Sequence, residues 1–296
     1  MALSRVAEIT IVGGTGFIGR TLAQRLVVEG HAVRIASRRS DAEVPAGCEL
    51  VPSTPLPASR VVINLAGEPI IGRWTRSKWA RIESSRLDLT RRLVEGFGAD
   101  EPPEVLINAS AVGFYGDGGE EELREEDAAG ADRAAVLCQA WEKEAQAAIA
   151  LGVRVVTPRI GLVLGAHGGA LGAMLPAFKL GMGGPLGSGR QWQPWIHVED
   201  AVAGIQHCIE QPVSGAVNLV GPEPVRQQDF ARALGRALGR PAVVPAPAWA
   251  LRLALGEAAD LLLASQRVVP GRLLQSGFIF RFPEISGALA DLLSRP

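Results

Sequence analysis

Short apolar runs rich in β-branched residues recur along the chain, and segments with a helical spacing of apolar positions separate them. Runs of this length are typical of strands that are buried on both faces of a parallel sheet. A weaker run at Glu49 to Pro52 predicts one more strand, between the second and the third of the clear ones. The clear strands are Ile9 to Val12, Ala32 to Ala36, Val61 to Leu65, Val105 to Ala109, Val153 to Thr157 and Ala216 to Val220.

The segments between the strands predict helices, because their apolar residues recur three and four positions apart. These helices cover Ile18 to Glu29, Ser77 to Phe97, Ala134 to Leu151 and Asp200 to Glu210. Asp200 can accept hydrogen bonds from the first turn of the last helix, so we expect it to be the N-cap. Strands that alternate with helices form right-handed βαβ units, and the pattern therefore predicts an α/β fold with a doubly wound parallel sheet.

The regular alternation ends after Thr157, where a glycine-rich stretch begins. Pro241 to Pro247 is typical of a linker, and helical patterns follow at Trp249 to Leu263 and at Ile285 to Leu293. We expect these pieces to form a smaller C-terminal lobe over the carboxyl edge of the sheet. The predicted sheet domain comprises residues 1–166 and 200–221, and the predicted lobe comprises residues 167–199 and 222–296.

The charge balance and the cysteines narrow the class of protein. Thirty basic residues against 31 acidic ones give a net charge of −1, so no overall field would attract nucleic acid or an anionic membrane. A small molecule is therefore the expected partner. The cysteines, Cys48, Cys138 and Cys208, are far apart and odd in number, which predicts neither a disulfide framework nor a metal site.

The first residues and the most apolar segment indicate a cytoplasmic protein. Met1 to Arg5 lead directly into the first strand, without the apolar stretch of a signal peptide. The longest apolar region, Pro245 to Ala264, contains an arginine, a glutamate and an aspartate, too many charges for a membrane span of about 20 residues. We expect a protein of the reducing cytoplasm, with no membrane contact.

A glycine cluster lies at the turn from the first strand into the first helix. This order of strand, glycine turn and helix is the context that a dinucleotide-binding motif requires. Gly14 and Gly16 would allow a tight turn and the approach of a pyrophosphate, Gly19 would let the helix pack on the strand, and the helix N-terminus would offer free N–H groups. The residues expected to contact a cofactor here are Gly13, Thr15, Gly16, Phe17, Ile18 and Gly19.

Several motifs together resemble the extended short-chain dehydrogenase/reductase superfamily. They are the glycine turn, Asn64 to Gly67, Asn108 to Asp117, Pro158 to Gly165 and Trp195 to Asp200. The chain is most similar to the atypical "epimerase family protein" group, whose blocks appear as Arg73-Trp74, Ser85-Arg86 and Gln266 to Pro270. The resemblance implies a Rossmann-type sheet, a C-terminal substrate lobe and further cofactor contacts from Leu65, Ala66, Gly67, Ala109 and Arg159.

The end of the second strand carries the signal for the type of nucleotide. An acidic residue at this place would bind the ribose hydroxyls of NAD, whereas this chain has Ser37, Arg38 and Arg39. A hydroxyl and two guanidinium groups can bind a 2′-phosphate through charge-assisted hydrogen bonds, so we expect NADP(H). A solvated surface turn is the alternative. Arg86 matches a position near the cofactor in extended members and could reach a phosphate, with an exposed helix arginine as its alternative.

The superfamily resemblance implies a serine or threonine that orients the substrate and a Tyr-x-x-x-Lys pair that exchanges a proton. Ser110 matches the serine, but the helix expected to carry the pair has no tyrosine. The single tyrosine, Tyr115, has no lysine four residues after it. We therefore assign catalysis to Ser110 and Tyr115, expect Ser110 to matter more, and keep a packing role as the alternative for Tyr115.

Other polar and aromatic residues are weaker candidates. Cys138 on an apolar helix face is typical of a buried hydrophobe, and His197 lies at a strand end next to the expected cap. Gln191, Trp192 and Trp195 either line a substrate cleft or pack the lobe.

These features predict an NADP(H)-dependent oxidoreductase that transfers hydride to or from a small carbonyl or alcohol. The missing tyrosine and lysine keep a second hypothesis open, a catalytically retired NADP(H)-binding sensor. A nucleotide-sugar epimerase or dehydratase is the third, because the resemblance includes such enzymes. The substrate and the oligomeric state stay undetermined, and a homodimer is left open.

Overall fold

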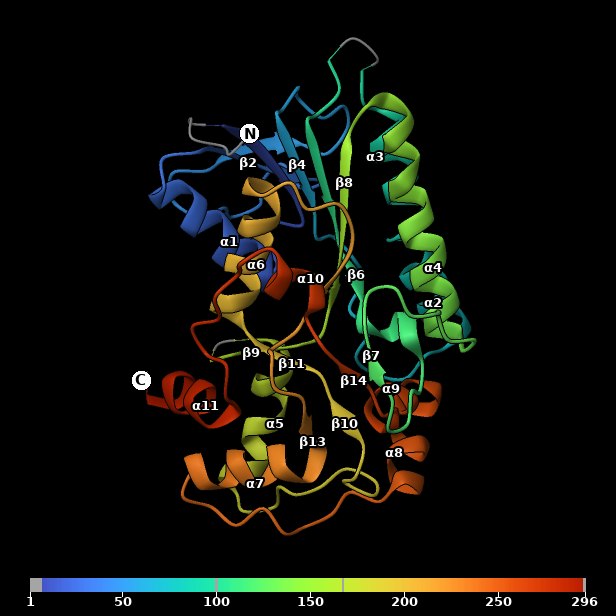
Figure 1. Ribbon diagram of the computed structural model, residues 1–296, viewed down its shortest axis with the longest axis vertical. Helices are drawn as coiled ribbons and strands as arrows, with labels where there is room; N and C mark the ends of the chain where they lie inside the picture. The colour runs from blue at the N-terminus through green and yellow to red at the C-terminus, as the bar shows by residue number, and fades with distance from the viewer. Residues whose placement is uncertain (1–6, 99–100, 167, 295–296) are drawn as a thin grey trace.

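The computed structural model describes residues 7–98, 101–166 and 168–294. Parallel strands form its central sheet in the order β12-β8-β5-β4-β1-β2-β3, and β6 also pairs with β8 (Figure 1). Their bounds are β1 (Glu8–Val12), β2 (Ala32–Ser37), β3 (Glu49–Pro52), β4 (Val61–Asn64), β5 (Val105–Asn108), β6 (Ser110–Ala111), β8 (Arg154–Ile160) and β12 (Gly215–Leu219). The predicted doubly wound sheet, including the weak strand β3, is confirmed.

Helices cover both faces of the sheet, and each face has its own apolar core (Figure 1). Leu22 and Leu26 of α1 and Ile205 of α6 pack on one face, whereas Leu93 of α3 and Ala145 of α4 pack on the other. The bounds are α1 (Phe17–Val28), α6 (Val198–Glu210), α2 (Arg76–Ser84), α3 (Leu87–Glu95) and α4 (Arg133–Gln146), which η2 (Ala147–Leu151) extends as a 3-10 turn. The order of the strands reverses between β1 and β4. Ligands bind at this point of reversal in doubly wound sheets.

The single helix predicted over Ser77 to Phe97 is wrong, because the chain bends between α2 and α3. The hydroxyl of Ser85 accepts a hydrogen bond from the Glu68 backbone N–H at 2.9 Å, which ties the bend to the loop after β4. Arg86, the residue before α3, has φ −109° and ψ −59°. The bend therefore places Arg86 beside that loop.

The N-cap predicted at Asp200 is also wrong. α6 begins at Val198, and His197 before it is the N-cap. Nδ1 of His197 accepts the hydrogen bond of the Glu199 N–H at 3.1 Å. The buried carboxylate of Asp200 instead accepts the backbone N–H groups of Arg281 and Phe282 at 2.8 and 2.9 Å. It fastens the C-terminal segment to α6.

Whereas α10 (Gly271–Gln275) packs on β12, most of the remaining elements gather beyond the carboxyl edge of the sheet (Figure 1). Leu171, Phe178, Trp195, Phe230 and Leu289 form a separate apolar core there. The helix predicted over Trp249 to Leu263 is interrupted at Gly256, whose φ is +62°. Whether the lobe follows the predicted domain boundaries stays a prediction. The bounds are β9 (Leu162–Gly165), α5 (Gly169–Lys179), β10 (Trp192–Gln193), β11 (Trp195–His197), β13 (Val225–Arg226), α7 (Gln227–Ala237), α8 (Ala248–Leu255), η3 (Gly256–Ala259), α9 (Asp260–Leu263), β14 (Arg267–Val268), α10 (Gly271–Gln275) and α11 (Ile285–Ser294), with η1 (Val112–Tyr115) and β7 (Glu122–Leu123) next to β6.

Within the described ranges, no helix has both the length and the apolar character needed to cross a membrane. Met1 to Arg5, on which the expectation about a signal peptide rests, lie outside the described residues.

Candidate functional site

The glycine turn between β1 and α1 has the conformation that only small residues allow. Gly13 has φ +85°, and a Cβ atom on it would lie 2.7 Å from the backbone nitrogen of Ala66. A Cβ on Gly19 would lie 2.4 Å from the carbonyl oxygen of Gly13, so this glycine lets α1 pack on the turn as expected. Thr15 and Gly16 are exposed at the start of α1. The turn therefore presents the helix N-terminus at the carboxyl edge of the sheet.

Two residues of the glycine motif also have packing contacts with other elements. A Cβ on Gly14 would lie 2.4 Å from the terminal methyl of Ile35, so this glycine also packs on β2. The ring of Phe17 lies on the glycine-rich segment after β9, where a Cβ on Gly165 or Gly168 would come within 2.3 or 2.7 Å of it. Phe17 therefore joins the turn to the lobe.

The loop after β4 lies directly beside the glycine turn. The N–H of Leu65 donates to the carbonyl of Val12 at 2.8 Å, and the N–H of Ala66 donates to the side chain of Asn64 at 3.3 Å. The structure thus brings together the predicted cofactor contacts of two loops, the glycine turn and the loop of Leu65, Ala66 and Gly67.

The end of β2 exposes the groups predicted to bind a 2′-phosphate. The hydroxyl of Ser37 accepts the backbone N–H of Arg39 at 3.0 Å. The guanidinium of Arg39 forms an ion pair with Asp41 at 3.1 Å and lowers the pKa of that carboxyl. Arg38 is exposed, and its side chain has no hydrogen bond or ion pair among the described residues. Arg38 is therefore the freer of the two cations.

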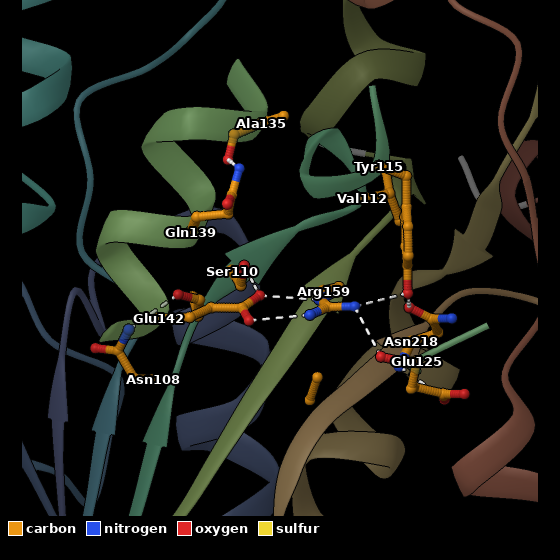
Figure 2. Close-up of polar contacts among 12 residues, drawn as sticks. Asn108, Ser110, Val112, Tyr115, Glu125, Ala135, Gln139, Glu142, Arg159 and Asn218 are labelled. Atoms are coloured by element: carbon orange, nitrogen blue, oxygen red, sulfur yellow. Dashed lines mark hydrogen bonds and ion pairs between the residues drawn. The ribbon is translucent and has the colours of Figure 1, made fainter. Parts of the chain in front are cut away.

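A buried polar network occupies the region of the predicted catalytic residues (Figure 2). The hydroxyl of Ser110 donates to Oε1 of Glu142 at 2.7 Å. Nε and Nη2 of Arg159 donate to Oε1 and Oε2 of the same carboxylate at 2.9 and 3.1 Å, and both side chains of this ion pair are about 5% exposed. An ionised carboxylate only accepts hydrogen bonds, so Ser110 must be the donor, and Ser110 is buried at 3% exposure.

Tyr115 belongs to the same network, on the far side of Arg159 (Figure 2). Nη1 of Arg159 donates to the Tyr115 hydroxyl at 2.9 Å, and Oδ1 of Asn218 lies 2.7 Å from that hydroxyl as an acceptor. Burial raises the pKa of Tyr115 to about 12, although the guanidinium of Arg159 acts against this shift. The phenol is therefore held in protonated form near neutral pH, and its catalytic role stays a prediction.

The guanidinium of Arg159 is held by protein groups on all sides. Besides Glu142 and Tyr115, it donates to the carbonyl of Glu125 at 3.1 Å, and its guanidinium lies 3.3 Å from the centre of the Phe114 ring. Its donors are all used inside the protein, and the predicted contact with a nucleotide stays a prediction. Ala109 is likewise buried, at 4% exposure.

At positions 138 and 139, α4 carries a thiol and an amide instead of a tyrosine and a lysine. Nε2 of Gln139 donates to the carbonyl of Ala135 at 3.3 Å, as drawn in Figure 2. Burial raises the pKa of Cys138 to about 12, which makes its thiol inert. His197 is buried and stacks on Phe282 with 3.9 Å between the ring centres. Both weaker candidates therefore have structural surroundings.

Two of the three residues considered for a substrate cleft are packing residues. Trp195 is 1% exposed and its indole N–H donates to the carbonyl of Glu223 at 3.0 Å. The side-chain amide of Gln191 donates to the carbonyls of Leu186 and Leu262 at 3.0 and 3.1 Å. Trp192 is half-buried.

Sequence reasoning missed the partners that complete the network. Glu125 accepts the backbone N–H groups of Asn218 and Arg272, each at 3.0 Å, and Gln266 donates to the carbonyls of Val112 and Gly116 at 3.0 and 2.8 Å. The hydrogen bonds of Gln266 hold the segment that follows α9 against η1, the turn after β6. The one local signal is Glu142, a charged residue on the helix face that otherwise packs on the sheet.

The comparisons with known proteins agree with this geometry. Residues 9–220 match the family model described as "NAD dependent epimerase/dehydratase family", and residues 246–292 match a domain of unknown function, DUF1731.

Named relatives match nearly the whole chain. The epimerase family protein SDR39U1 of Mus musculus is 39% identical and covers 97% of this chain and 100% of the mouse protein. The epimerase family protein YfhF of Bacillus subtilis is 38% identical over 97% of this chain and 98% of its own length. A crystal structure of human epimerase family protein SDR39U1 with NADPH superposes with a TM-score of 0.89 at 34% identity, covering 97% of this chain and 99% of the human one.

Proposed function

The chain belongs to the NAD dependent epimerase/dehydratase family, and from this premise we propose that it is an NADP(H)-dependent oxidoreductase. The reaction is hydride transfer to or from a small carbonyl or alcohol. The observation that carries the proposal is the end of β2, where Arg38 is exposed and where Ser37 to Arg39 include no acidic residue that would bind ribose hydroxyls. The NADPH in the human relative supports the choice of nucleotide.

The chain's own residues fit such a cofactor at two places. The exposed turn at Thr15 and the N-terminus of α1 suit the pyrophosphate, whereas the Gly16 N–H already donates to the Gly13 carbonyl at 3.0 Å. Ser37 and Arg38 suit the 2′-phosphate, with Arg39 as a second cation once it leaves Asp41. The nicotinamide, when bound, supplies or accepts the hydride.

Ser110 is the residue that we propose to orient the substrate. Its proton is committed to Glu142, so its oxygen is set to accept a hydrogen bond. An alcohol hydroxyl meets this requirement directly. Tyr115 then contributes by holding Arg159, which in turn holds Glu142.

A second candidate function is a nucleotide sensor without turnover. The observation that favours it is α4, which offers an alanine, a glutamine and an inert thiol where a proton-transferring pair would be needed. A nucleotide-sugar epimerase or dehydratase stays the third candidate through the family alone. A turnover assay with a panel of ketones, aldehydes and alcohols separates the first two, because a sensor consumes no NADPH.

The test of the nucleotide assignment is calorimetric titration with NADPH and NADH at fixed ionic strength. A hydrogen bond to a charged group contributes about 1.5–3 kcal/mol, so NADPH should bind roughly ten- to a hundred-fold more tightly than NADH. Arg38→Ala should remove most of this difference and leave NADH binding unchanged. Arg39→Ala is the matched control, with a smaller loss because Asp41 already neutralises Arg39. Equal affinities for the two nucleotides in the unchanged protein would contradict the proposal.

A further inference from the structure

Arg86 lies at the bend between α2 and α3 with its guanidinium enclosed by two other elements. A Cβ on Gly67, in the loop after β4, would lie 3.2 to 3.3 Å from the central carbon and both terminal nitrogens, so the glycine backbone covers one face of the guanidinium. The guanidinium also lies 5.1 Å from the ring centre of Trp141 on α4. Its plane and position are therefore fixed by the fold.

Only one of the three nitrogens of this guanidinium is used. Nη1 donates to the carbonyls of Glu68 and Ile82, each at 3.2 Å, and to the Ser85 hydroxyl at 3.4 Å. In the part of the chain that the structure describes, Nε and Nη2 have no acceptor. These two nitrogens form the side edge of the guanidinium, which is the edge that binds a carboxylate through two parallel hydrogen bonds.

The charge of Arg86 also lacks a partner. No carboxylate of the described residues lies within 4.0 Å of it, and the nearby Glu68 is paired with Arg81 at 3.3 Å. Burial is the main influence on the group and lowers the pKa of Arg86. A half-buried cation with an open donor edge is typical of a site that receives an anion.

The position of Arg86 decides which anion this is. The places suited to the cofactor phosphates are the glycine turn after β1 and the end of β2, and both have their own donors. Arg86 lies beyond β4, against α4, on the half of the sheet formed by β4, β5 and β8. In doubly wound sheets the two halves bind the two halves of a dinucleotide, so the adenosine phosphates lie away from this side.

We propose that Arg86 binds a carboxylate of the substrate through Nε and Nη2, which makes the substrate a small oxo or hydroxy acid. This inference rests on the proposed function, because it needs the cofactor to fill the other half of the site. It moves Arg86 from the cofactor, where the sequence placed it, to the substrate. The Trp141 ring faces the Arg86 guanidinium, and Glu142 accepts the Ser110 hydrogen bond. Because Trp141 and Glu142 are consecutive residues of α4, one helix contacts both groups that we propose to bind the substrate.

The test uses NADP⁺-loaded protein, because a ketone and NADP⁺ bind together without reacting. Calorimetry compares 4-oxopentanoate with 2-pentanone, which has no carboxylate, and includes inorganic phosphate as a third probe. The oxo acid should bind at least ten-fold more tightly than the ketone in the unchanged protein. Arg86→Gln should abolish the difference, whereas Arg92→Gln, an exposed arginine of α3, should keep it.

A second variant guards against a folding defect in Arg86→Gln. Gly67→Ala keeps the charge but pushes a methyl group against the guanidinium, and should reduce the preference for the oxo acid several-fold. Equal binding of acid and ketone, including no binding of either, overturns the inference, and so does tighter binding of phosphate than of the oxo acid. If Arg86→Gln weakens NADP⁺ itself ten-fold, Arg86 belongs to the cofactor. Absence of NADP⁺ binding in the unchanged protein refutes the proposed function instead.

Discussion

Replacing Glu142 by glutamine tests whether the buried network holds the fold together. The side chains of Glu142 and Arg159 are 6% and 5% exposed, and the carboxylate accepts three hydrogen bonds, two from Arg159 and one from Ser110. The glutamine amide is neutral, so the charge of Arg159 stays in the core without its counter-ion. Breaking a buried ion pair from one side costs about 3–5 kcal/mol. At about 2–4 °C per kcal/mol, the melting temperature should fall by roughly 6–20 °C.

The same helix provides a matched control two residues away. Glu144 pairs with Arg91 at 2.6 Å, but its side chain is 24% exposed and that of Arg91 is 49% exposed. Exposed pairs contribute about 0.2–1 kcal/mol, because water and salt screen both charges. Glu144→Gln should therefore lower the melting temperature by no more than about 4 °C. Urea titration and calorimetry at pH 7 measure both variants.

A double variant separates the loss of the pair from the cost of an isolated charge. Glu142→Gln with Arg159→Met removes both charges and keeps a side chain of similar length, so it should be more stable than Glu142→Gln alone. If Glu142→Gln and Glu144→Gln lose the same stability, or if the double variant is the least stable of all, the reasoning about the buried charge is refuted.

The remaining predictions concern single side chains of the site and its supports. With a reducible substrate found from the carbonyl panel, Ser110→Ala should lose turnover and Tyr115→Phe should retain more of it; loss in Tyr115→Phe alone would reverse the assignment. Tyr115 is the only tyrosine, so absorbance at 295 nm follows it alone, and the folded protein should show no phenolate until the pH approaches 12. Because the unfolded phenol ionises at a pKa of about 10, the raised pKa in the fold should cost stability as the pH rises between these values, up to roughly 3 kcal/mol, and a flat urea midpoint across that range would contradict the burial argument. Asp200→Asn should cost about 1–3 kcal/mol and speed amide exchange at Arg281 and Phe282, and unchanged exchange there would show that the two hydrogen bonds do not hold the segment.

The parts of the fold that follow from short-range patterns could be predicted from the sequence. The strands, α1 and the glycine turn depend on residues within about ten positions of one another, so their apolar spacing and their glycines are local evidence. The bend at Ser85 could not be predicted in this way, because its cause is a hydrogen bond to the backbone of Glu68, 17 residues earlier. Asp200 likewise has the composition of an N-cap, but its acceptors serve residues 81 and 82 positions away.

The candidate site also has parts that depend on residues near in sequence and parts that depend on residues far apart. The contacts expected for the nucleotide come from backbone and glycine geometry, which a motif records, and Gly13 and Gly19 lie as the motif requires. The network that holds Ser110 comes from Ser110, Glu142 and Arg159, which belong to three elements and meet only in the folded chain. Arg159 shows the consequence, since its motif predicted a cofactor contact while the structure gives it a carboxylate and a phenol.

The absence of a Tyr-x-x-x-Lys pair changes how the two leading functions should be weighed. A sensor needs the nucleotide half of the site alone, and nothing in nucleotide binding requires an unpaired guanidinium beyond β4. The guanidinium of Arg86 and the hydroxyl of Ser110 contact consecutive residues of α4, Trp141 and Glu142, and these are the two groups that we propose for a second ligand. Holding Glu142 and Arg159 charged in the core carries a desolvation cost, which a purely structural contact between apolar side chains would avoid. We infer that the network is retained because it fixes the position of Ser110, which favours an enzyme that binds a substrate over a sensor that binds only a nucleotide.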